Sequence, residues 1–240
     1  MTALTSPRSA SGVSAVAAET LARLRAAGVV PGGIRADSRA IRAGEVFVAW
    51  PGGQSDGRQY LRQAVERGAC AVRWEPSAGF AAPELPVPGW AVEGLRQVAG
   101  ELAHLIYQQP SQHLWVAGVT GTNGKTTVSQ WIAAALAAHG ERCGVIGTLG
   151  SGYPGALQAG ANTTPGAVDL HRLFAEFRDE GATAVAMEVS SIGLEEGRLH
   201  AVAFDVALFT NLTHDHLDYH NDMANYAAAK ARLFDWPGLQ

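Results

Sequence analysis

The sequence predicts an α/β protein in which a small N-terminal α/β substrate domain precedes a mostly parallel central sheet with a phosphate-binding loop. Three observations support this class. Short, continuous apolar runs alternate with helix-length amphipathic segments, and glycine is abundant, at 28 of 240 residues. One apolar run also leads directly into a glycine-rich loop and then a helix, in the segment VAGVTGTNGKTT at 116–127.

The first part of the chain, residues 1–108, is expected to form an αβαβ domain. A helix over 13–27 is stopped by Gly28. The elements expected after it are a strand at 45–50, a glycine-rich turn at 51–57, a helix near 59–67, a strand at 69–74, a proline-rich loop at 82–89, and a short strand and helix through 107. Residues 108–111 are the expected linker.

The second part, residues 109–240, alternates more regularly. Strands are expected at 114–119, 143–148, 182–189 and 205–210, and helices at 125–139, 167–180 and 222–234. Polar clusters follow the strand ends, at 120–127, 162–164, 188–191 and 211–220. Because ligands of parallel sheets bind beyond the carboxyl ends of the strands, we expect these four clusters to share one crevice.

Composition excludes several classes of function. The net charge of −4 provides no basic footprint for nucleic acid. No apolar run reaches the roughly 18 to 20 residues of a membrane span, and the N-terminus lacks the apolar region of a secretory signal. We therefore expect a cytoplasmic protein without nucleic-acid or membrane partners. Cys70 and Cys143 are too few and too distant for a disulfide framework, and we expect both to be buried free thiols.

The loop at 116–127 is interpreted as a phosphate loop. Small residues let backbone amides surround a phosphate, Lys125 supplies a positive charge, and Thr126 offers a hydroxyl to magnesium. The match to G-x-x-x-x-G-K-[ST] is imperfect, because Val119 stands where glycine is required. The alternative is a tight strand-to-helix turn with a surface lysine. The expected ATP-binding residues are Gly121, Thr122, Asn123, Gly124, Lys125, Thr126 and Thr127.

One residue and one segment further along the chain indicate a metal site. Glu188 ends an apolar strand, where an unpaired carboxylate is unfavourable, so a bound cation would explain it; a solvated strand-end glutamate is the alternative. The segment THDHLDYH at 213–220 has the composition of a zinc site. Phosphate-loop chemistry requires a hard divalent ion instead, so we favour magnesium.

Five segments together resemble a known family. They are GTNGKTT at 121–127, ANTTPG at 161–166, AMEVSSIGL at 186–194, FTNLTHDHLDYH at 209–220 and YAAAK at 226–230. In this order they resemble the Mur ligase superfamily of ATP-dependent amide-forming enzymes. Within it they are most similar to the MurE branch, which adds the third amino acid to UDP-N-acetylmuramoyl-L-alanyl-D-glutamate in peptidoglycan synthesis. The resemblance covers residues 35–235.

The resemblance implies roles for individual residues, with ATP and Mg²⁺ as cofactors. The implied catalytic residues are Lys125, Glu188, His216 and Lys230, and the implied metal ligands are Thr126, Glu188, His216 and Lys230, the last as a carbamate. The implied substrate-binding residues are Ser38, Gly53, Gln54, Ser55, Asn162, Thr163, Thr164, Ser190 and Arg198. The chain departs from the family pattern at Ile192, where histidine is usual, and at Glu196, where glutamine is expected.

The implied reaction passes through an acyl phosphate, and its substrates are UDP-muramyl dipeptide and an amino acid. The resemblance also implies that the full-length protein is a monomer. Relatives carry a third domain, which would follow residue 240, so we expect the 240 residues alone to be inactive. The third amino acid, diaminopimelate or lysine, stays open. Two rivals also stay open: a folylpolyglutamate synthase-like ligase, and a nucleotide-binding module without turnover.

Overall fold

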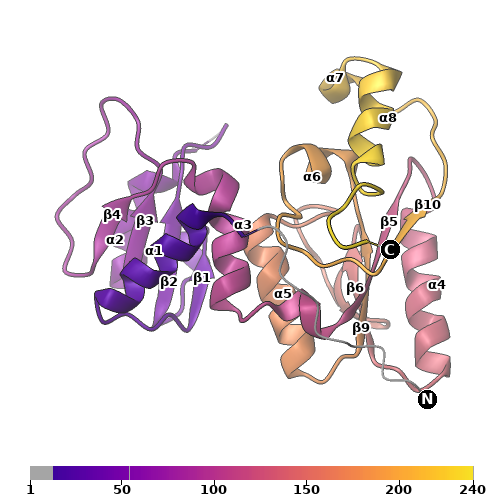
Figure 1. Ribbon diagram of the computed structural model, residues 1–240, viewed down its shortest axis with the longest axis horizontal. Helices are drawn as coiled ribbons and strands as arrows, with labels where there is room; N and C mark the ends of the chain where they lie inside the picture. Colours follow the sequence, from indigo (N-terminus) through magenta and orange to yellow (C-terminus); the bar gives the residue numbers. More distant parts are fainter. Residues whose placement is uncertain (1–12, 54, 240) are drawn as a thin grey trace. The chain divides into compact units, whose positions relative to one another are not determined.

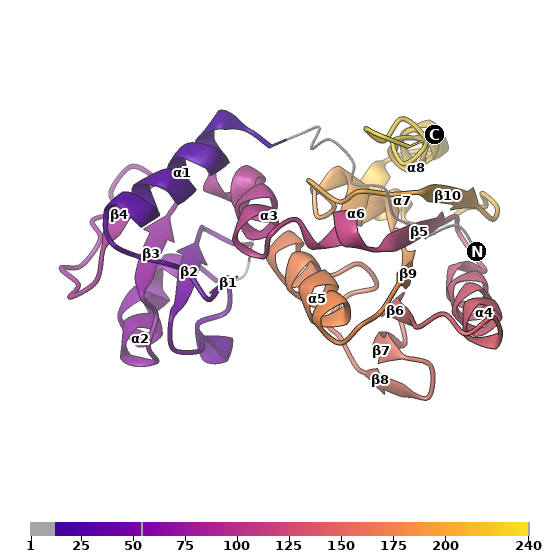
Figure 2. The ribbon, with the colours of Figure 1, turned by 60° about the horizontal axis from the view of Figure 1, so that its bottom comes forward.

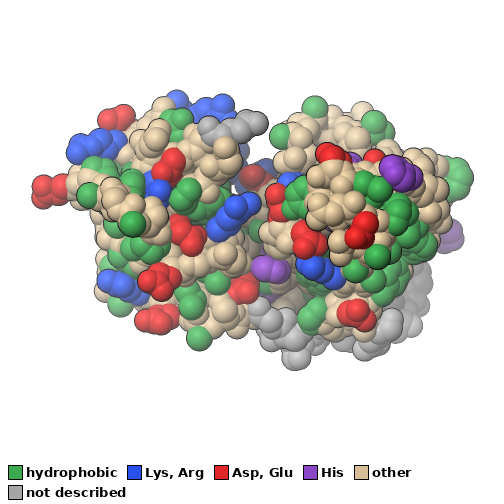
Figure 3. Space-filling view, turned by 90° about the horizontal axis from the view of Figure 1, so that it is seen from above, with side chains coloured by type: hydrophobic (Ala, Val, Ile, Leu, Met, Phe, Trp, Pro, Cys, Tyr) green, Lys and Arg blue, Asp and Glu red, His purple; other side chains and the backbone are tan. Residues whose placement is uncertain are grey.

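The computed structural model describes residues 13–53 and 55–239, which form two compact units (Figure 1). One extends from Val13 to Gln108 and the other begins at Gln109. None of the helices in the described part of the chain has both the length and the apolar character that a membrane span requires. Acidic and basic side chains are interspersed on the face seen in Figure 3.

The first unit is built on a four-stranded sheet whose neighbouring strands all pair in parallel, in the order β1-β2-β3-β4. The strands are β1 (Gly33–Arg35), β2 (Glu45–Ala49), β3 (Ala71–Trp74) and β4 (Gly89–Ala91). The helices are α1 (Ala15–Ala26), α2 (Leu61–Glu66) and α3 (Leu95–Ile106), with 3₁₀ turns at Ser38–Ala40 and Gly57–Tyr60. Helices α1 and α3 lie on one face of this sheet and α2 on the other (Figure 2).

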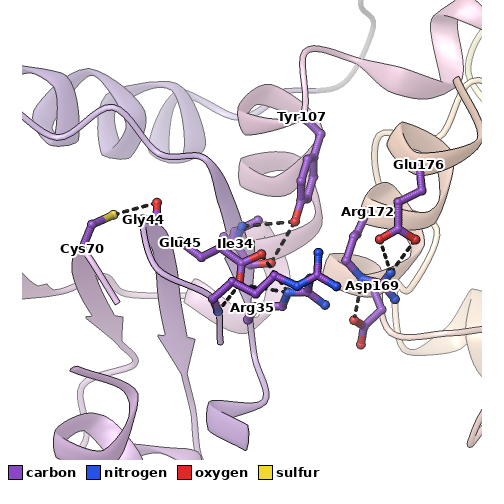
Figure 4. Close-up of polar contacts among 10 residues, drawn as sticks. Ile34, Arg35, Gly44, Glu45, Cys70, Tyr107, Asp169, Arg172 and Glu176 are labelled. Atoms are coloured by element: carbon purple, nitrogen blue, oxygen red, sulfur yellow. Dashed lines mark hydrogen bonds and ion pairs between the residues drawn. The ribbon is translucent and has the colours of Figure 1, made fainter. Parts of the chain in front are cut away.

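Alternation along β2 explains how this sheet is covered. Phe47 and Ala49 pack in one cluster with Leu61 of α2, as expected for side chains two apart on a strand. The short strand β1 is held by polar contacts, which Figure 4 shows. Arg35 forms a buried ion pair with Glu45 at 3.0 Å, and the Tyr107 hydroxyl donates to the Ile34 carbonyl at 3.2 Å.

The second unit contains a six-stranded sheet in the order β10-β5-β9-β6-β7-β8. Its strands are β5 (Trp115–Thr120), β6 (Cys143–Gly147), β7 (Gly150–Tyr153), β8 (Ala156–Gln158), β9 (Ala184–Glu188) and β10 (Val206–Phe209). Its helices are α4 (Lys125–Ala138), α5 (Ala167–Asp179), α6 (Ser191–Glu195), α7 (Leu217–His220) and α8 (Met223–Ala231), after a 3₁₀ turn at Pro110–His113. Strands β10, β5, β9 and β6 pair in parallel, whereas β7 and β8 are antiparallel.

Both faces of the parallel part are covered. Along β9, Val185 and Met187 join Phe174 of α5 in one apolar cluster. Ala184 and Ala186 point the other way and meet Ala133 of α4. The views in Figures 1 and 2 agree that α4 and α5 lie on opposite sides of this sheet. The register of β9 therefore directs Glu188, two residues after Ala186, to the side where α4 begins.

The predicted alternation of parallel strands and helices is confirmed, with some differences, among them the short helices α6 and α7, which were not expected. The strand β1 and the hairpin β7–β8 were not expected, because β1 has only three residues and Gly150–Tyr153 reads GSGY, without an apolar run. The expected linker contains left-handed Gln108 and Gln109, and then continues as the 3₁₀ turn. Cys143 is a buried free thiol as expected, but Cys70 is only half-buried, since it precedes β3 rather than lying within it.

Candidate functional site

The turn between β5 and α4 has the geometry of an anion-binding loop. Its two glycines adopt positive φ angles, 142° at Gly121 and 86° at Gly124, and Gly124 caps α4. A side chain on Gly121 would collide with the Thr210 hydroxyl. Glycine is therefore required here both by conformation and by close packing. The following amides open α4, a 14-residue helix whose N-terminus favours negative charge.

The segment that follows β10 holds this loop in shape. The Thr122 amide donates to the Asn211 carbonyl at 2.9 Å. The Asn211 side chain pairs with the Asn123 backbone in both directions, at 3.1 Å each. The Thr210 hydroxyl donates to the Asn123 carbonyl at 2.6 Å. Because the adjacent strand end fixes the loop, its shape is set before any ligand binds.

Two buried or half-buried ammonium groups contact the same loop carbonyl. Lys125 Nζ donates to the Gly121 and Thr122 carbonyls at 2.9 Å, and Lys230 Nζ donates to the Gly121 carbonyl at 3.0 Å. Burial lowers the pKa of Lys125. Burial and then the nearby Lys125 charge lower the pKa of Lys230 to about 8. They are the only two lysines in the sequence, where the other 16 cationic side chains are arginine.

Glu188 ends β9, beside the loop, where the strand ends were expected to form a crevice. Its carboxylate belongs to a residue that is only 1% exposed. Its Oε1 accepts from the Thr126 hydroxyl and the Thr148 amide, both at 2.9 Å, and its Oε2 accepts from the Thr148 hydroxyl at 3.0 Å. A side chain on Gly147 would collide with this carboxylate. Because Gly147 of β6 has no side chain, the Glu188 carboxylate can occupy the space beside it.

This oxygen-rich set fits magnesium. No group of three or more His, Cys, Asp or Glu side chains converges on a metal-sized site within residues 13–53 and 55–239. Magnesium does not need such a cage, because it usually takes one or two carboxylates and fills its other positions with water and substrate phosphates. Glu188, together with the Thr126 hydroxyl at the start of α4, provides a matching hard donor pair.

His216 sits at the rim of this arrangement. Its residue adopts a positive φ of 52°, its side chain is 46% exposed, and its Nε2 lies 3.6 Å from Asp215. Its ring meets Tyr226 edge-on, and the Tyr226 hydroxyl lies 3.2 Å from that of Thr122. Of the four expected metal ligands, Thr126 and Glu188 are hydrogen-bonded to each other, and Lys230 donates to the Gly121 carbonyl of the loop. No hydrogen bond in the described part joins His216 to them.

Three of the expected acceptor residues, Thr163, Thr164 and Ser190, lie close to Glu188 or to its partner Thr148. The Thr164 hydroxyl donates to the Glu188 carbonyl and accepts from the Ser190 amide, both at 3.0 Å. Thr163 lies 3.0 Å from Thr148, hydroxyl to hydroxyl. Ser190 caps α6 by accepting from the Gly193 amide. Asn162 lines a separate cavity of about 280 Å³ beside α5, where Arg172 pairs with Asp169 and Glu176 (Figure 4).

Arg198 already has an anionic partner. Its guanidinium donates to the Thr164 carbonyl at 2.8 Å and binds the Glu196 carboxylate at 2.6 Å. Glu196 is the position where the family pattern has glutamine, so the departure places a carboxylate against the arginine expected to hold an acid substrate. An incoming carboxylate would have to compete with this ion pair.

The expected sugar-nucleotide residues fall in the first unit. Ser38 and Ser55 both line a cavity of about 560 Å³ together with Trp50, Tyr60 and Gln63. The Ser38 hydroxyl donates to the Gln63 side chain at 2.6 Å. Gly53 is exposed and does not belong to this lining. Gln54 lies outside the described residues.

Sequence reasoning missed Thr148 altogether. It follows β6. Polar site residues were expected after the neighbouring strands of the sheet, but none was expected after this one. The pair of lysines is a second unused signal. Where arginine supplies every other cation, lysine at two positions indicates a need for an amine rather than for charge alone.

Comparison with known proteins finds relatives that match most of this chain. Residues 119–239 match the Mur ligase middle domain, and residues 32–107 match the Mur ligase family catalytic domain. A curated relative from Nitrosomonas europaea, UDP-N-acetylmuramoyl-L-alanyl-D-glutamate–2,6-diaminopimelate ligase, is 52% identical over 205 residues and is matched over 85% of this chain. The enzyme of the same name from Pseudomonas aeruginosa is 51% identical, also over 85% of this chain.

Solved structures show the same fold. A structure of UDP-N-acetylmuramoyl-L-alanyl-D-glutamate–2,6-diaminopimelate ligase matches with a TM-score of 0.72 and 37% identity, over 88% of this chain and 42% of that one. MurF ligase from Thermotoga maritima, in complex with ADP, matches in fold with a TM-score of 0.58 and 19% identity, over 85% and 43%. The chain spans 39% of the Nitrosomonas relative and 42% of the Pseudomonas relative.

Proposed function

The chain belongs to the Mur ligase family, and from that premise we propose that its protein is an ATP-dependent ligase of peptidoglycan synthesis. The proposed reaction joins 2,6-diaminopimelate to UDP-N-acetylmuramoyl-L-alanyl-D-glutamate, as in the names of the relatives. The observation that carries the proposal is the convergence on one loop of Lys125, Lys230 and the Thr126–Glu188 pair. The diaminopimelate assignment rests on the relatives' names.

The loop and its lysine would bind the phosphates of ATP. Lys125 donates hydrogen bonds to two carbonyl oxygens of the loop. Those bonds can be exchanged for phosphate oxygens, since an ammonium on a flexible stem reorients readily. Lys125 would then stabilise the charge that develops as the acceptor carboxylate attacks the γ-phosphate to give an acyl phosphate. The amino group of the incoming amino acid would displace phosphate and form the amide.

Thr126 and Glu188 are the residues proposed to hold Mg²⁺, with His216 as a further ligand from the rim. The ion would supply positive charge that makes the γ-phosphate more electrophilic. Lys230 is proposed to carry a carbamate. Its burial supports this role, because a pKa of about 8, well below the ordinary 10.5, greatly increases the small fraction of neutral amine that can capture carbon dioxide near neutral pH.

Each unit contains residues that we propose as acceptor contacts. We assign the uridine end to the first unit's cavity, with Ser38 and Ser55 as contacts and Gly53 and Gln54 in the adjoining loop. Asn162, Thr163, Thr164, Ser190 and Arg198 are assigned to the acid end. On this proposal, residues 1–108 form a UDP-substrate domain and residues 109–240 form an ATP-binding domain.

Binding measurements on this chain test the proposal. Calorimetry should detect an ATP analogue with Mg²⁺ and, separately, UDP-muramyl dipeptide. Binding of a folate instead of the dipeptide would support the folylpolyglutamate synthase alternative. Folded protein that binds neither nucleotide nor dipeptide would contradict the proposal.

Turnover is then measured on the gene product that contains this chain. ADP release should require both UDP-muramyl dipeptide and diaminopimelate, and lysine should not replace the latter. Absence of ADP release by that whole product would favour a nucleotide-binding module without turnover. For the 240 residues alone, we expect binding without amide formation, because reaction rates depend on complete positioning of the reacting groups.

The lysine content makes the carbamate directly observable. With only two lysines in the sequence, ¹³C-labelled bicarbonate should give a single new carbamate resonance, apart from the chain's amino terminus. Lys230→Arg should remove that resonance. A resonance that persists in Lys230→Arg would place the carbamate elsewhere.

A further inference from the structure

Thr148 links the proposed metal carboxylate to the proposed acceptor loop. It lies directly after β6. Its hydroxyl is 3.0 Å from Oε2 of Glu188 on one side and 3.0 Å from the Thr163 hydroxyl on the other. Its amide adds a third contact, to Oε1 of Glu188 at 2.9 Å.

Hydrogen counting gives this chain of contacts a direction. A threonine hydroxyl has one hydrogen, and the Thr148 hydroxyl donates it to the Glu188 carboxylate. The bond between Thr163 and Thr148 must therefore use the hydrogen of Thr163. A hydroxyl that accepts one hydrogen bond becomes a stronger donor in the next. Thr163 thus strengthens the bond from Thr148 to Glu188 without touching Glu188 itself.

The rest of Glu188 is fixed by other contacts. Its backbone carbonyl accepts from Thr164, and its Oε1 is shared between the Thr126 hydroxyl and the Thr148 amide. In the described part of the crevice, Oε2 has the Thr148 hydroxyl as its hydrogen-bond donor. The orientation of the carboxylate about its last bond is therefore set by contacts to both oxygens; Thr148 contributes to both, and its hydroxyl also contacts Thr163.

We propose that Thr148 is a positioning residue that orients Glu188 for Mg²⁺ and transmits the state of the 162–164 loop to it. This inference rests on the proposed function, because it takes Glu188 as the metal ligand and Thr163 as part of the acceptor site. Hydrogen-bond partners of metal-binding carboxylates typically change metal affinity by about 10- to 100-fold when removed.

The test measures Mg²⁺ affinity in this chain with a fluorescent ATP analogue as the reporter. Thr148→Val removes the hydroxyl and keeps the amide. It should weaken Mg²⁺ binding about tenfold and leave binding of the nucleotide without metal within about twofold. Thr148→Ser should restore the parental Mg²⁺ affinity, because serine keeps the hydroxyl.

A matched control is available at the opposite end of β9. The Thr183 hydroxyl donates to the Glu141 carboxylate at 2.7 Å, so Thr183→Val removes the same kind of bond away from the crevice. It should leave Mg²⁺ affinity unchanged. Thermal unfolding of all variants checks that they fold. Equal Mg²⁺ affinity in the parent and in Thr148→Val would overturn the inference, as would a Thr148→Ser variant as weak as the valine variant.

A double-mutant cycle tests the transmission step. Thr163→Val should weaken Mg²⁺ binding about threefold in the parent but have no effect in Thr148→Val, since its influence would pass only through Thr148. Additive effects would overturn transmission. The proposed function fails differently: the parent itself would then show no Mg²⁺-dependent nucleotide binding, which would overturn both.

Discussion

The crevice of the second unit and the cavity of the first unit are organised in opposite ways. In the crevice, Lys125, Lys230 and Glu188 all have hydrogen-bond partners within the site. In the cavity of about 560 Å³, polar side chains such as Ser38 and Ser55 lie among Trp50 and Tyr60. The crevice therefore contains charged groups that are mostly buried, whereas the cavity combines aromatic side chains with polar ones and with the exposed ion pair of Asp37 and Arg39.

The difference follows from what each region must hold. Phosphates and a divalent cation interact strongly enough to repay the exchange of existing hydrogen bonds, so charged groups can be fixed in advance. The neutral uracil ring of the proposed substrate would gain binding energy from contact area and a few hydrogen bonds, so an open pocket with aromatic walls suffices. Substitutions in the two regions should differ accordingly in size and kind.

The largest expected effect concerns stability in the first unit, away from its cavity. Glu45→Ala leaves the Arg35 guanidinium buried without its carboxylate, which should lower the free energy of unfolding of this unit by about 3 kcal/mol. Nucleotide binding by the second unit should stay unchanged. Denaturant unfolding with hydrogen exchange of 33–49 measures this. The exposed pair Arg39–Asp37 is the control, and Arg39→Ala should leave the stability of the unit nearly unchanged.

If Glu45→Ala weakened nucleotide binding as strongly as it weakened the first unit, the two regions would not be independent. The stability of the first unit would then affect the nucleotide site of the second. A loss of stability as small as that of Arg39→Ala would show that the buried pair contributes little.

The second largest effect should be on nucleotide affinity. Lys125→Ala removes the ammonium that the loop carbonyls hold, and should weaken binding of an ATP analogue about a hundredfold, or about 2.7 kcal/mol. Calorimetry on this chain measures it. Arg142→Ala, which removes a half-exposed cation at the other end of β6, is the control and should bind normally. Weakening of less than about threefold in Lys125→Ala would remove the loop from the proposed site.

The same contrast explains what the sequence could predict. The phosphate loop was predictable because backbone conformation restricts its residue types: Gly121 needs a φ that other residues avoid, and Lys125 follows at a fixed spacing. Glu188 was predictable because a carboxylate at the end of an apolar strand needs an explanation. Both signals arise from strong local constraints that leave a mark on residue identity.

Weaker constraints left no such mark. Thr148 is an ordinary polar residue in a turn, and its meaning depends on the parallel pairing of β6 with β9, which a single sequence does not reveal. The hairpin β7–β8 is held by backbone pairing of small residues, so its pattern lacks the apolar run of a buried strand. The ion pair of Arg198 with Glu196 was also missed, since each residue was considered alone.

A third prediction concerns pH and isolates one of the two lysines. The pKa of Lys230 is about 8 in the folded protein, below the ordinary value of 10.5, because burial disfavours the ammonium. Between these values the unfolded chain binds a proton that the folded chain has lost. The free energy of unfolding should therefore rise with pH from about 8 to 10.5, as the penalty of burying the ammonium disappears.

Lys230→Met keeps the length of the side chain without its charge, so the difference between parent and variant reports this lysine alone. The parent's free energy of unfolding should rise relative to that of the variant across this range. Denaturant titrations in carbon-dioxide-free buffer measure it. Parallel curves for parent and variant would mean that the ammonium is not disfavoured in the folded protein.

The smallest expected effect tests whether Glu196 masks the acid end of the site. Glu196 holds the Arg198 guanidinium at 2.6 Å, so a substrate carboxylate must displace one negative group to bind there. Glu196→Gln keeps a side chain of the same shape and removes the charge. The affinity for UDP-muramyl dipeptide should increase about threefold, because Arg198 no longer exchanges one full ion pair for another. Glu195→Gln, which weakens an exposed pair with Arg232, controls for the general loss of one negative charge nearby. Equal gains in affinity in both variants would indicate a long-range charge effect that salt screens. A gain confined to Glu196→Gln would show that the Glu196 carboxylate competes with the substrate for Arg198.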